Sequence, residues 1–270
     1  MSRARGAGAG RIGEAFRKLD GAGRRGFIPF ITAGDPDLPT TRALIVELAR
    51  AGATLVELGV PFSDPVADGP VIQRSSERAL SRGVGLADVL STLADARRET
   101  DVPVILFSYF NPLLQFGVER LAEESARAGV DGILATDLVP EESAEFNAVL
   151  ARHGLDQIFL VAPTTTDARL RLVAERASGF VYAVSRAGVT GARTDLSSEA
   201  ARLVERVRLA TDLPVAVGFG ISSPEHVAEV WRYADAAVVG SALVAEIEGR
   251  AGSPDLVARV GEFARSLLPH

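Results

Sequence analysis

The chain has 270 residues, 47% of them hydrophobic and 24% charged, enough for one large core with a charged surface. Its net charge of −6 argues against a nucleic-acid partner, because phosphate backbones require clustered positive charge. The absence of cysteine excludes disulfides, thiolate nucleophiles and cysteine-bound zinc. No apolar run approaches the roughly 20 residues of a membrane helix, and the N-terminus lacks the apolar centre of a signal peptide, so we expect a cytoplasmic protein.

The chain opens with residues 1–10, which are rich in arginine, alanine and glycine and are predicted to form a flexible tail. Arg11–Leu19 is predicted to be a helix that lies before the first strand and caps the floor of the fold. The remaining residues, 11–270, show no break in composition and are predicted to form a single domain.

Short, continuous apolar runs then recur about every 25–30 residues, with amphipathic helices such as Thr40–Ala51 between them. Such runs are typical of parallel strands that are covered on both faces. Eight of these units predict a closed (β/α)8 barrel of the TIM type, with Phe263–Leu268 closing the last helix. A doubly wound sheet is less favoured, because no glycine-rich dinucleotide fingerprint is present. The predicted strands are Phe27–Ile31, Thr54–Leu58, Val104–Phe107, Gly132–Ala135, Gln157–Val161, Phe180–Val184, Pro214–Val217 and Ala236–Val239.

The reactive side chains exclude several mechanisms, because barrel enzymes carry their catalytic groups at the C-terminal ends of strands. Lys18, the only lysine, precedes the first strand, which argues against Schiff-base chemistry and a pyridoxal phosphate cofactor. His153 and His226 lie in or near helices and His270 ends the chain, which argues against a histidine-bound metal. A magnesium site made of carboxylates alone stays open, although no acidic cluster supports it.

Carboxylate chemistry remains, and Glu57 is the first candidate because it lies inside the apolar second strand. Burial raises the pKa of a glutamate toward the range that is useful for acid–base catalysis. The alternative is a structural ion pair with an arginine.

The segment that follows, Val60–Pro70, contains two aspartates and three prolines before a helix predicted to begin near Val71. Asp68 could return to the active site as a second carboxylate. Equally, Asp64 and Asp68 could only form turns or cap the helix.

Glycines at the ends of the last three strands indicate a phosphate site. They lie in Gly188–Gly191, Gly218–Ser222 and Gly240–Ser241. Glycine lets backbone N–H groups approach a phosphate, and a helix that begins at Ser241 would add its dipole. The alternative is that these glycines only form turns.

Aromatic side chains fall at or near strand ends, where they could pack in the core or line a flat pocket for an aromatic ring. They are Phe30, Phe107, Tyr109, Tyr182 and Phe219.

Taken together, the motifs resemble the tryptophan synthase alpha chain family over about Arg11 to Glu248. The similar strings occur in the order that the family has, and the second is highly specific. They are Pro29–Pro36 (PFITAGDP), Glu57–Pro70 (ELGVPFSDPVADGP), Tyr109–Pro112 (YFNP), Ser185–Gly191 (SRAGVTG) and Gly218–Ser222 (GFGIS).

The resemblance implies an enzyme that cleaves indole-3-glycerol phosphate to indole and glyceraldehyde-3-phosphate, with Glu57 as the acid–base and Asp68 bonded to the indole N–H. It implies that the five aromatic residues line the indole pocket. It also implies a beta-chain partner near Asp64 and Pro65, an alpha2-beta2 heterotetramer, and pyridoxal phosphate only in the beta chain. The implied phosphate-binding residues are Thr190, Gly191, Gly220, Gly240 and Ser241.

Three rival functions stay open at this point. The first is a stand-alone lyase that releases free indole, and the second is an inactive subunit that only activates a beta chain. The third is another phosphate-binding barrel isomerase, such as an epimerase. Retention of Glu57 and Asp68 argues against the inactive subunit, and the lack of strand-end histidine argues against the isomerase.

Overall fold

The structure is a computed structural model that describes residues 10–184, 193–218 and 220–269. In these ranges eight parallel strands close into a barrel in chain order, with β8 paired to β1. This confirms the predicted barrel, and each observed strand end lies within two residues of its prediction. The strands are β1 (Gly26–Thr32), β2 (Val56–Gly59), β3 (Val104–Ser108), β4 (Gly132–Ala135), β5 (Asp156–Val161), β6 (Val181–Val184), β7 (Val215–Gly218) and β8 (Ala236–Val239).

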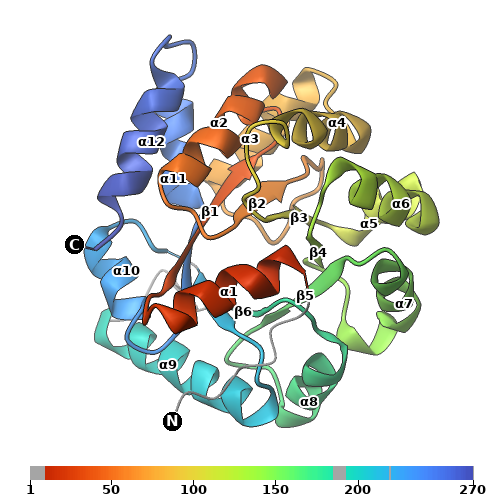
Figure 1. Cartoon of the computed structure of the whole chain (residues 1–270), viewed down its shortest axis with the longest axis vertical. Coiled ribbons are helices and arrows are strands. Elements are labelled where there is room, and N and C mark those ends of the chain that lie inside the picture. The colour runs from red at the N-terminus through yellow and green to blue at the C-terminus, as the bar shows by residue number, and fades with distance from the viewer. Residues whose placement is uncertain (1–9, 185–192, 219, 270) are drawn as a thin grey trace.

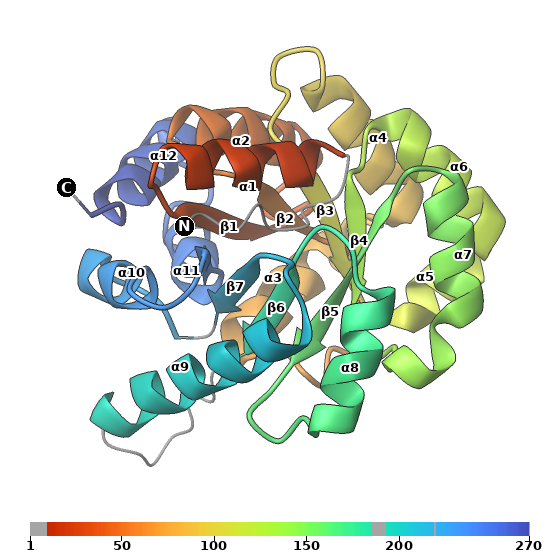
Figure 2. The same ribbon diagram turned by 60° about the horizontal axis from the view of Figure 1, so that its bottom comes forward.

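Helices cover the outside and one end of the barrel (Figures 1 and 2). They are α1 (Arg11–Gly21), α2 (Leu38–Arg50), α3 (Pro70–Ser81), α4 (Leu86–Ala96), α5 (Phe110–Phe116), α6 (Val118–Ala128), the 3-10 turn η1 (Pro140–Glu142), α7 (Ala144–Arg152), α8 (Asp167–Arg176), α9 (Arg193–Ala210), α10 (Pro224–Val230), α11 (Ser241–Gly249) and α12 (Leu256–Ser266).

Helix α2 shows how local chemistry sets a boundary that periodicity alone misses. It begins at Leu38, two residues before the predicted Thr40, because the Asp37 side chain accepts the Thr40 N–H at 2.7 Å. Pro39 then lies in the first turn, where a missing N–H costs nothing.

Alternate residues of each strand point to opposite faces and so build two cores. The larger core lies between the strands and the ring of helices, and the smaller core fills the barrel itself. The barrel is therefore a packed interior and not a pore. Buried residues of the smaller core include Ile28, Leu55, Ile105, Leu134, Ile158, Phe180, Ala216 and Ala236.

Helix α1 crosses the end of the barrel at which the strands begin (Figure 1). Its Ile12 and Phe16 are buried in the inner core, and the Phe16 ring lies 5.8 Å from the Phe180 ring. The predicted capping of the barrel floor is confirmed. Residues 1–9 lie outside the described ranges, so the division into a tail and one domain stays a prediction.

Side chains at the start of every even-numbered strand bind the preceding odd-numbered strand. Each accepts a hydrogen bond from a backbone N–H at or near that strand's beginning, over 2.8 to 3.1 Å. These contacts satisfy donors at the barrel floor that would otherwise be buried without a partner. The pairs are Thr54 with Phe27, Asp131 with Val104, Ser178 with Gln157, and Asp235 with Val215.

The described ranges contain neither a membrane-spanning helix nor a candidate metal site. None of the helices found there is long and apolar enough to cross a membrane. The same residues contain no cluster of three histidine, aspartate or glutamate side chains that could hold a metal ion.

Asp131 allows a test of the floor contacts, because its buried carboxylate also pairs with Arg11 at 2.6 Å and Arg97 at 2.9 Å. We expect Asp131→Ala to lower the free energy of unfolding by about 3 kcal/mol, since it leaves the Val104 N–H without its acceptor and removes the carboxylate that offsets the charge of Arg97. Urea unfolding measures this loss. The control Glu123→Ala breaks an exposed pair with Arg127 and should change stability by less than about 0.5 kcal/mol. Equal losses would contradict the special role of the floor.

Candidate active site

The predicted site residues of β1, β2, β3 and β6 come together inside the barrel, toward the C-terminal ends of the strands. Glu57 is paired in register with Phe30 on one side and with Ile105 on the other. Its side chain therefore points into the barrel between apolar neighbours. Position in the sheet, and not a loop, fixes where this carboxyl group lies.

Glu57 is 1% exposed, and its Oε1 atom has no hydrogen-bond partner. Burial raises the pKa of Glu57 well above its ordinary value. No cation pairs with Glu57 within the described residues, so the alternative of a structural ion pair receives no support there. The raised pKa favours the protonated form of this carboxyl group, which can act as a proton donor.

Tyr182 lies beside this carboxyl group in the barrel interior. Burial raises the pKa of the Tyr182 phenol well above its ordinary value. Gly218 makes room for this phenol, because a Cβ atom there would lie only 2.1 Å from the Tyr182 hydroxyl oxygen. The close approach explains why β7 ends in glycine.

A small cavity, which we name the central pocket, lies at the C-terminal ends of the strands. Phe30 and Phe107 meet there edge to face, with ring centres 5.3 Å apart. The free volume is about 10 Å³, room for about one water molecule. Of the predicted residues, Phe30, Phe107, Tyr109 and Asp68 line it together. The full lining is Phe30, Thr32, Gly59, Val60, Asp68, Ile72, Ser76, Phe107, Ser108 and Tyr109.

Asp68 reaches the central pocket and does not cap α3. The N-cap of that helix is Gly69, without a side-chain bond. The Tyr109 hydroxyl instead donates to Asp68 Oδ2 over 3.3 Å. Burial raises the pKa of Asp68 to about 6, although the Tyr109 hydrogen bond works in the opposite direction. Two carboxyl groups in different surroundings, both with raised pKa values, therefore lie at one end of the barrel.

Tyr109 anchors loop two, which we define as residues 60–69. Its hydroxyl oxygen accepts a hydrogen bond from the Ala67 N–H over 2.9 Å, and the centre of its ring lies 5.0 Å from the centre of the Phe62 ring. Burial, followed by the charge of Asp68, raises the pKa of Tyr109 to about 12, so its hydroxyl keeps its proton. The sequence places an aromatic residue here but does not show that it reaches loop two.

Helix α3 supplies two further pocket residues that the sequence analysis missed, Ile72 and Ser76. The Ser75 hydroxyl lies 2.6 Å from that of Thr32 and so ties the helix to the end of β1. The signal was a pair of small polar residues, Ser75 and Ser76, on the inner face of an amphipathic helix.

The predicted phosphate-binding residues are described in part. Gly240 is the N-cap of α11, which begins at Ser241 as predicted, and lies beside Phe30. Gly220 has a φ of 71°, a left-handed conformation that favours glycine. Thr190, Gly191 and the predicted pocket residue Phe219 lie outside the described residues.

The predicted partner-facing residues lie on the outer side of loop two. Asp64 is exposed, and Pro65 is half-buried. Both line a groove of about 470 Å³, and their neighbour Val66 is 89% exposed. The other lining residues are Phe62, Ser63, Gln73, Glu77 and Leu80.

Comparison with known proteins identifies the family. The family model described as tryptophan synthase alpha chain matches residues 16–267. The chain belongs to the tryptophan synthase alpha chain family. The alpha chain of Solibacter usitatus is 51% identical over 257 residues, which cover 95% of this chain and 96% of that one. The alpha chain of Geobacter sulfurreducens is 50% identical, with 95% and 97% covered.

Solved structures agree with this family assignment. The tryptophan synthase alpha subunit of Legionella pneumophila superposes with a TM-score of 0.89 at 37% identity and covers 96% of this chain and 97% of its own. A structure of the tryptophan synthase a2b2 complex of Pyrococcus furiosus contains a chain with a TM-score of 0.84 at 38% identity, with 90% and 97% covered. In this member of the family, Glu57 and Asp68 are thus the candidate catalytic pair.

The bond between Tyr109 and Asp68 predicts a change in pH dependence. If ionised Asp68 is the active form, kcat/KM falls as the pH drops through about 6. Tyr109→Phe removes a hydrogen bond that lowers the pKa of Asp68, so this acid limb should move upward by roughly 0.5 in pH. The control Tyr233→Phe removes a hydroxyl group from a tyrosine that does not line the central pocket. It should leave the acid limb of the pH profile unchanged. An unshifted limb in Tyr109→Phe would contradict the assignment.

Proposed function

We propose that Glu57 and Asp68 perform the reaction of the family, the cleavage of indole-3-glycerol phosphate to indole and glyceraldehyde-3-phosphate. A tryptophan synthase alpha chain is a carbon–carbon lyase. The observation that carries the residue assignment is a buried Glu57 carboxyl with an unpartnered oxygen, next to a pocket that holds a second carboxylate. Unpaired buried carboxyls concentrate at functional sites.

The protonated Glu57 first gives its proton to C3 of the indole ring, which turns the ring into an electron sink. The hydroxyl on the side-chain carbon bonded to the ring then loses its proton to the Glu57 carboxylate. As the carbon–carbon bond breaks, its electron pair returns to the ring, and the side-chain carbon becomes the aldehyde. Glu57 regains the proton that it gave, so the reaction needs no other acid and no cofactor in this chain.

Asp68 stabilises the intermediate by its charge. Positive charge develops at the indole nitrogen once C3 is protonated, and an ionised carboxylate that accepts the N–H bond offsets it. With a pKa of about 6, Asp68 is mostly ionised at pH 7, whereas burial favours the protonated form of Glu57. Their different environments therefore divide the two roles.

The other end of the substrate is bound by the start of α11. Backbone N–H groups after Gly240 point out of the helix, and the helix dipole favours an anion there. Thr190, Gly191 and Gly220 complete the proposed phosphate site. An indole ring needs more room than the 10 Å³ of the central pocket, so Phe107 or loop two moves when the ring enters.

A beta chain is the proposed partner, in an alpha2-beta2 heterotetramer that works in the cytoplasm and holds pyridoxal phosphate in the beta chain only. The Pyrococcus furiosus complex supports the association. The groove beside Asp64 and Pro65, with exposed Val66 at its edge, is the proposed docking surface. Loop two thus faces the partner on one side and carries Asp68 on the other.

The experiment is an incubation of the purified chain with indole-3-glycerol phosphate, with and without a beta chain, in which released indole is measured. Slow release that accelerates with the beta chain would support the proposed function. Fast release that ignores the beta chain would favour a stand-alone lyase. No release under either condition would contradict the proposed substrate.

Glu57→Gln keeps the shape of the side chain and removes its ability to transfer a proton. We expect kcat to fall by at least 10²-fold while the substrate still binds, as measured by equilibrium dialysis. Asp156→Asn is a matched control, because burial also raises the pKa of Asp156, but at the opposite end of the barrel. That variant should keep kcat within about twofold. A Glu57→Gln enzyme of nearly full rate would refute the role of Glu57.

A further inference from the structure

The two faces of helix α3 make different contacts. Its inner face contributes Ile72 and Ser76 to the central pocket. Its outer face carries Arg74 and Arg78, which are four residues apart and therefore lie one above the other. The helix begins at Pro70, two residues after Asp68, so any shift of α3 also moves this carboxylate.

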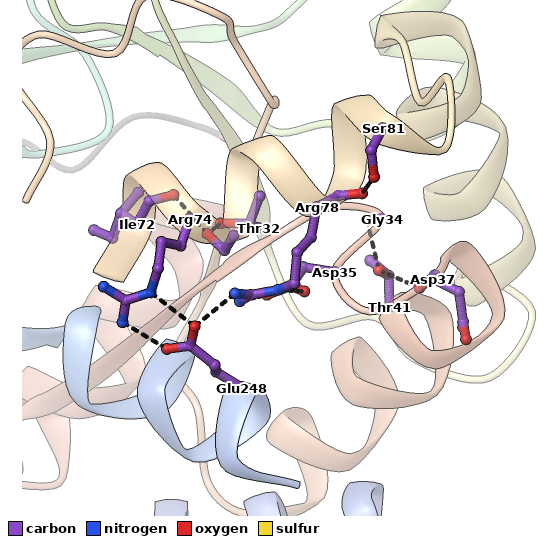
Figure 3. A network of polar contacts seen from close by, with 11 residues as sticks. Thr32, Gly34, Asp35, Asp37, Thr41, Ile72, Arg74, Arg78, Ser81 and Glu248 are labelled. Atoms are coloured by element: carbon purple, nitrogen blue, oxygen red, sulfur yellow. Dashed lines mark hydrogen bonds and ion pairs between the residues drawn. The ribbon is translucent and has the colours of Figure 1, made fainter. Parts of the chain in front are cut away.

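Both arginines bind one carboxylate, that of Glu248 near the end of α11 (Figure 3). Arg74 donates two bonds to it, over 2.8 and 2.7 Å, and Arg78 donates a third over 2.7 Å. The hydrogen bond from Arg74 is the largest influence that lowers the pKa of Glu248, to about 2. Glu248 is therefore ionised at pH 7.

Arg78 extends the network to a third element. It donates two bonds of 2.8 Å to Asp35, which lies in the loop after β1 and is only 2% exposed. Paired bonds between guanidinium and carboxylate groups fix orientation as well as distance. Asp35 thereby fixes Arg78 next to the end of the strand that carries Phe30, and Arg78 in turn holds the Glu248 carboxylate.

The network joins the two ends of the proposed substrate site. Helix α11 begins at Ser241, where the phosphate is proposed to bind, and α3 follows Asp68, which is proposed to bind the indole nitrogen. A substrate held at both ends requires a fixed separation between them. A misplacement of about 1 Å can cost about 10²-fold in rate.

We infer that Glu248, through Arg74 and Arg78, is a positioning residue that sets the separation between the phosphate-binding start of α11 and the Asp68 carboxylate. The inference rests on the proposed function for the roles of these two ends. It assigns Glu248 no contact with the substrate. Isolated surface ion pairs contribute little, but this one is paired twice on one side and tied to a buried carboxylate on the other.

Glu248→Gln tests the inference, and α11 offers a matched control. Among the residues that the structure describes, Glu246 on the same helix pairs only with Arg250, which lies just past the end of α11. Glu246→Gln therefore makes the same chemical change without touching α3. We expect Glu248→Gln to lower kcat about tenfold. Inhibition by inorganic phosphate, which occupies one end only, should stay within about twofold. Glu246→Gln should match the wild type in both measurements.

A double-mutant cycle with Asp68→Asn separates positioning from general damage. If Glu248 acts through the placement of Asp68, Glu248→Gln should lower the residual kcat of Asp68→Asn by less than twofold. A full tenfold loss in that background would overturn the inference, and so would equal kcat values for Glu248→Gln and Glu246→Gln. If Glu248→Gln fails to fold, Arg74→Gln removes only the exposed arm of the network and should lower kcat about threefold, whereas an unchanged kcat would overturn the inference.

Backbone hydrogen exchange gives a readout that does not depend on activity. Glu248→Gln should speed exchange in both 65–69 and 240–243, whereas Glu246→Gln should affect α11 alone. Exchange that is unchanged in both segments would overturn the inference. A wild-type chain that releases no indole would instead refute the proposed function, while the exchange result would still decide whether the network holds the two segments.

Discussion

Burying the Glu57 carboxyl inside the barrel costs free energy, and the surroundings of this group determine how that cost is met. Its neighbours in register are Phe30 and Ile105, and burial alone accounts for its raised pKa. Burial therefore favours the protonated form of the group, because charging it in an apolar interior would cost more free energy still. Asp68 lies at the pocket edge with a hydroxyl donor and is ionised at pH 7. Glu57 in the barrel interior and Asp68 at the pocket edge therefore differ in how strongly their surroundings disfavour the ionised form.

The sequence contains much of this arrangement, because strong physical constraints leave clear patterns. Strands covered on both faces must be continuously apolar, and a glutamate inside such a run is conspicuous, so the barrel and Glu57 are predictable. The place of Asp68 is not predictable from spacing, since an aspartate two residues before a helix can cap it or turn away. Contacts across the fold decide the matter: Gly69 caps α3, and Tyr109 draws Asp68 inward across 41 residues of sequence.

Charged residues of α3 show the same limit. Arg74 and Arg78, read along the helix, resemble an ordinary solvated face. Their partner Glu248 lies 174 and 170 residues away, so no local pattern could reveal it. Likewise, the small polar pair Ser75 and Ser76 shows its use only when β1 and the pocket are placed beside it. Local constraints are legible in one sequence, whereas pairings between distant segments require the fold.

The side chains at the barrel floor divide the closed sheet into units. Thr54, Asp131, Ser178 and Asp235 each join an even strand to the odd strand before it, whereas the starts of β3, β5 and β7 meet the strand before them through backbone bonds. The circle thus contains four side-chain-linked parallel pairs, each formed by strands that are neighbours in sequence. Within each pair the linked residues are 20 to 27 positions apart. At the strand starts, separating two neighbouring pairs would break backbone hydrogen bonds, whereas separating the two strands of one pair would break a side-chain hydrogen bond as well.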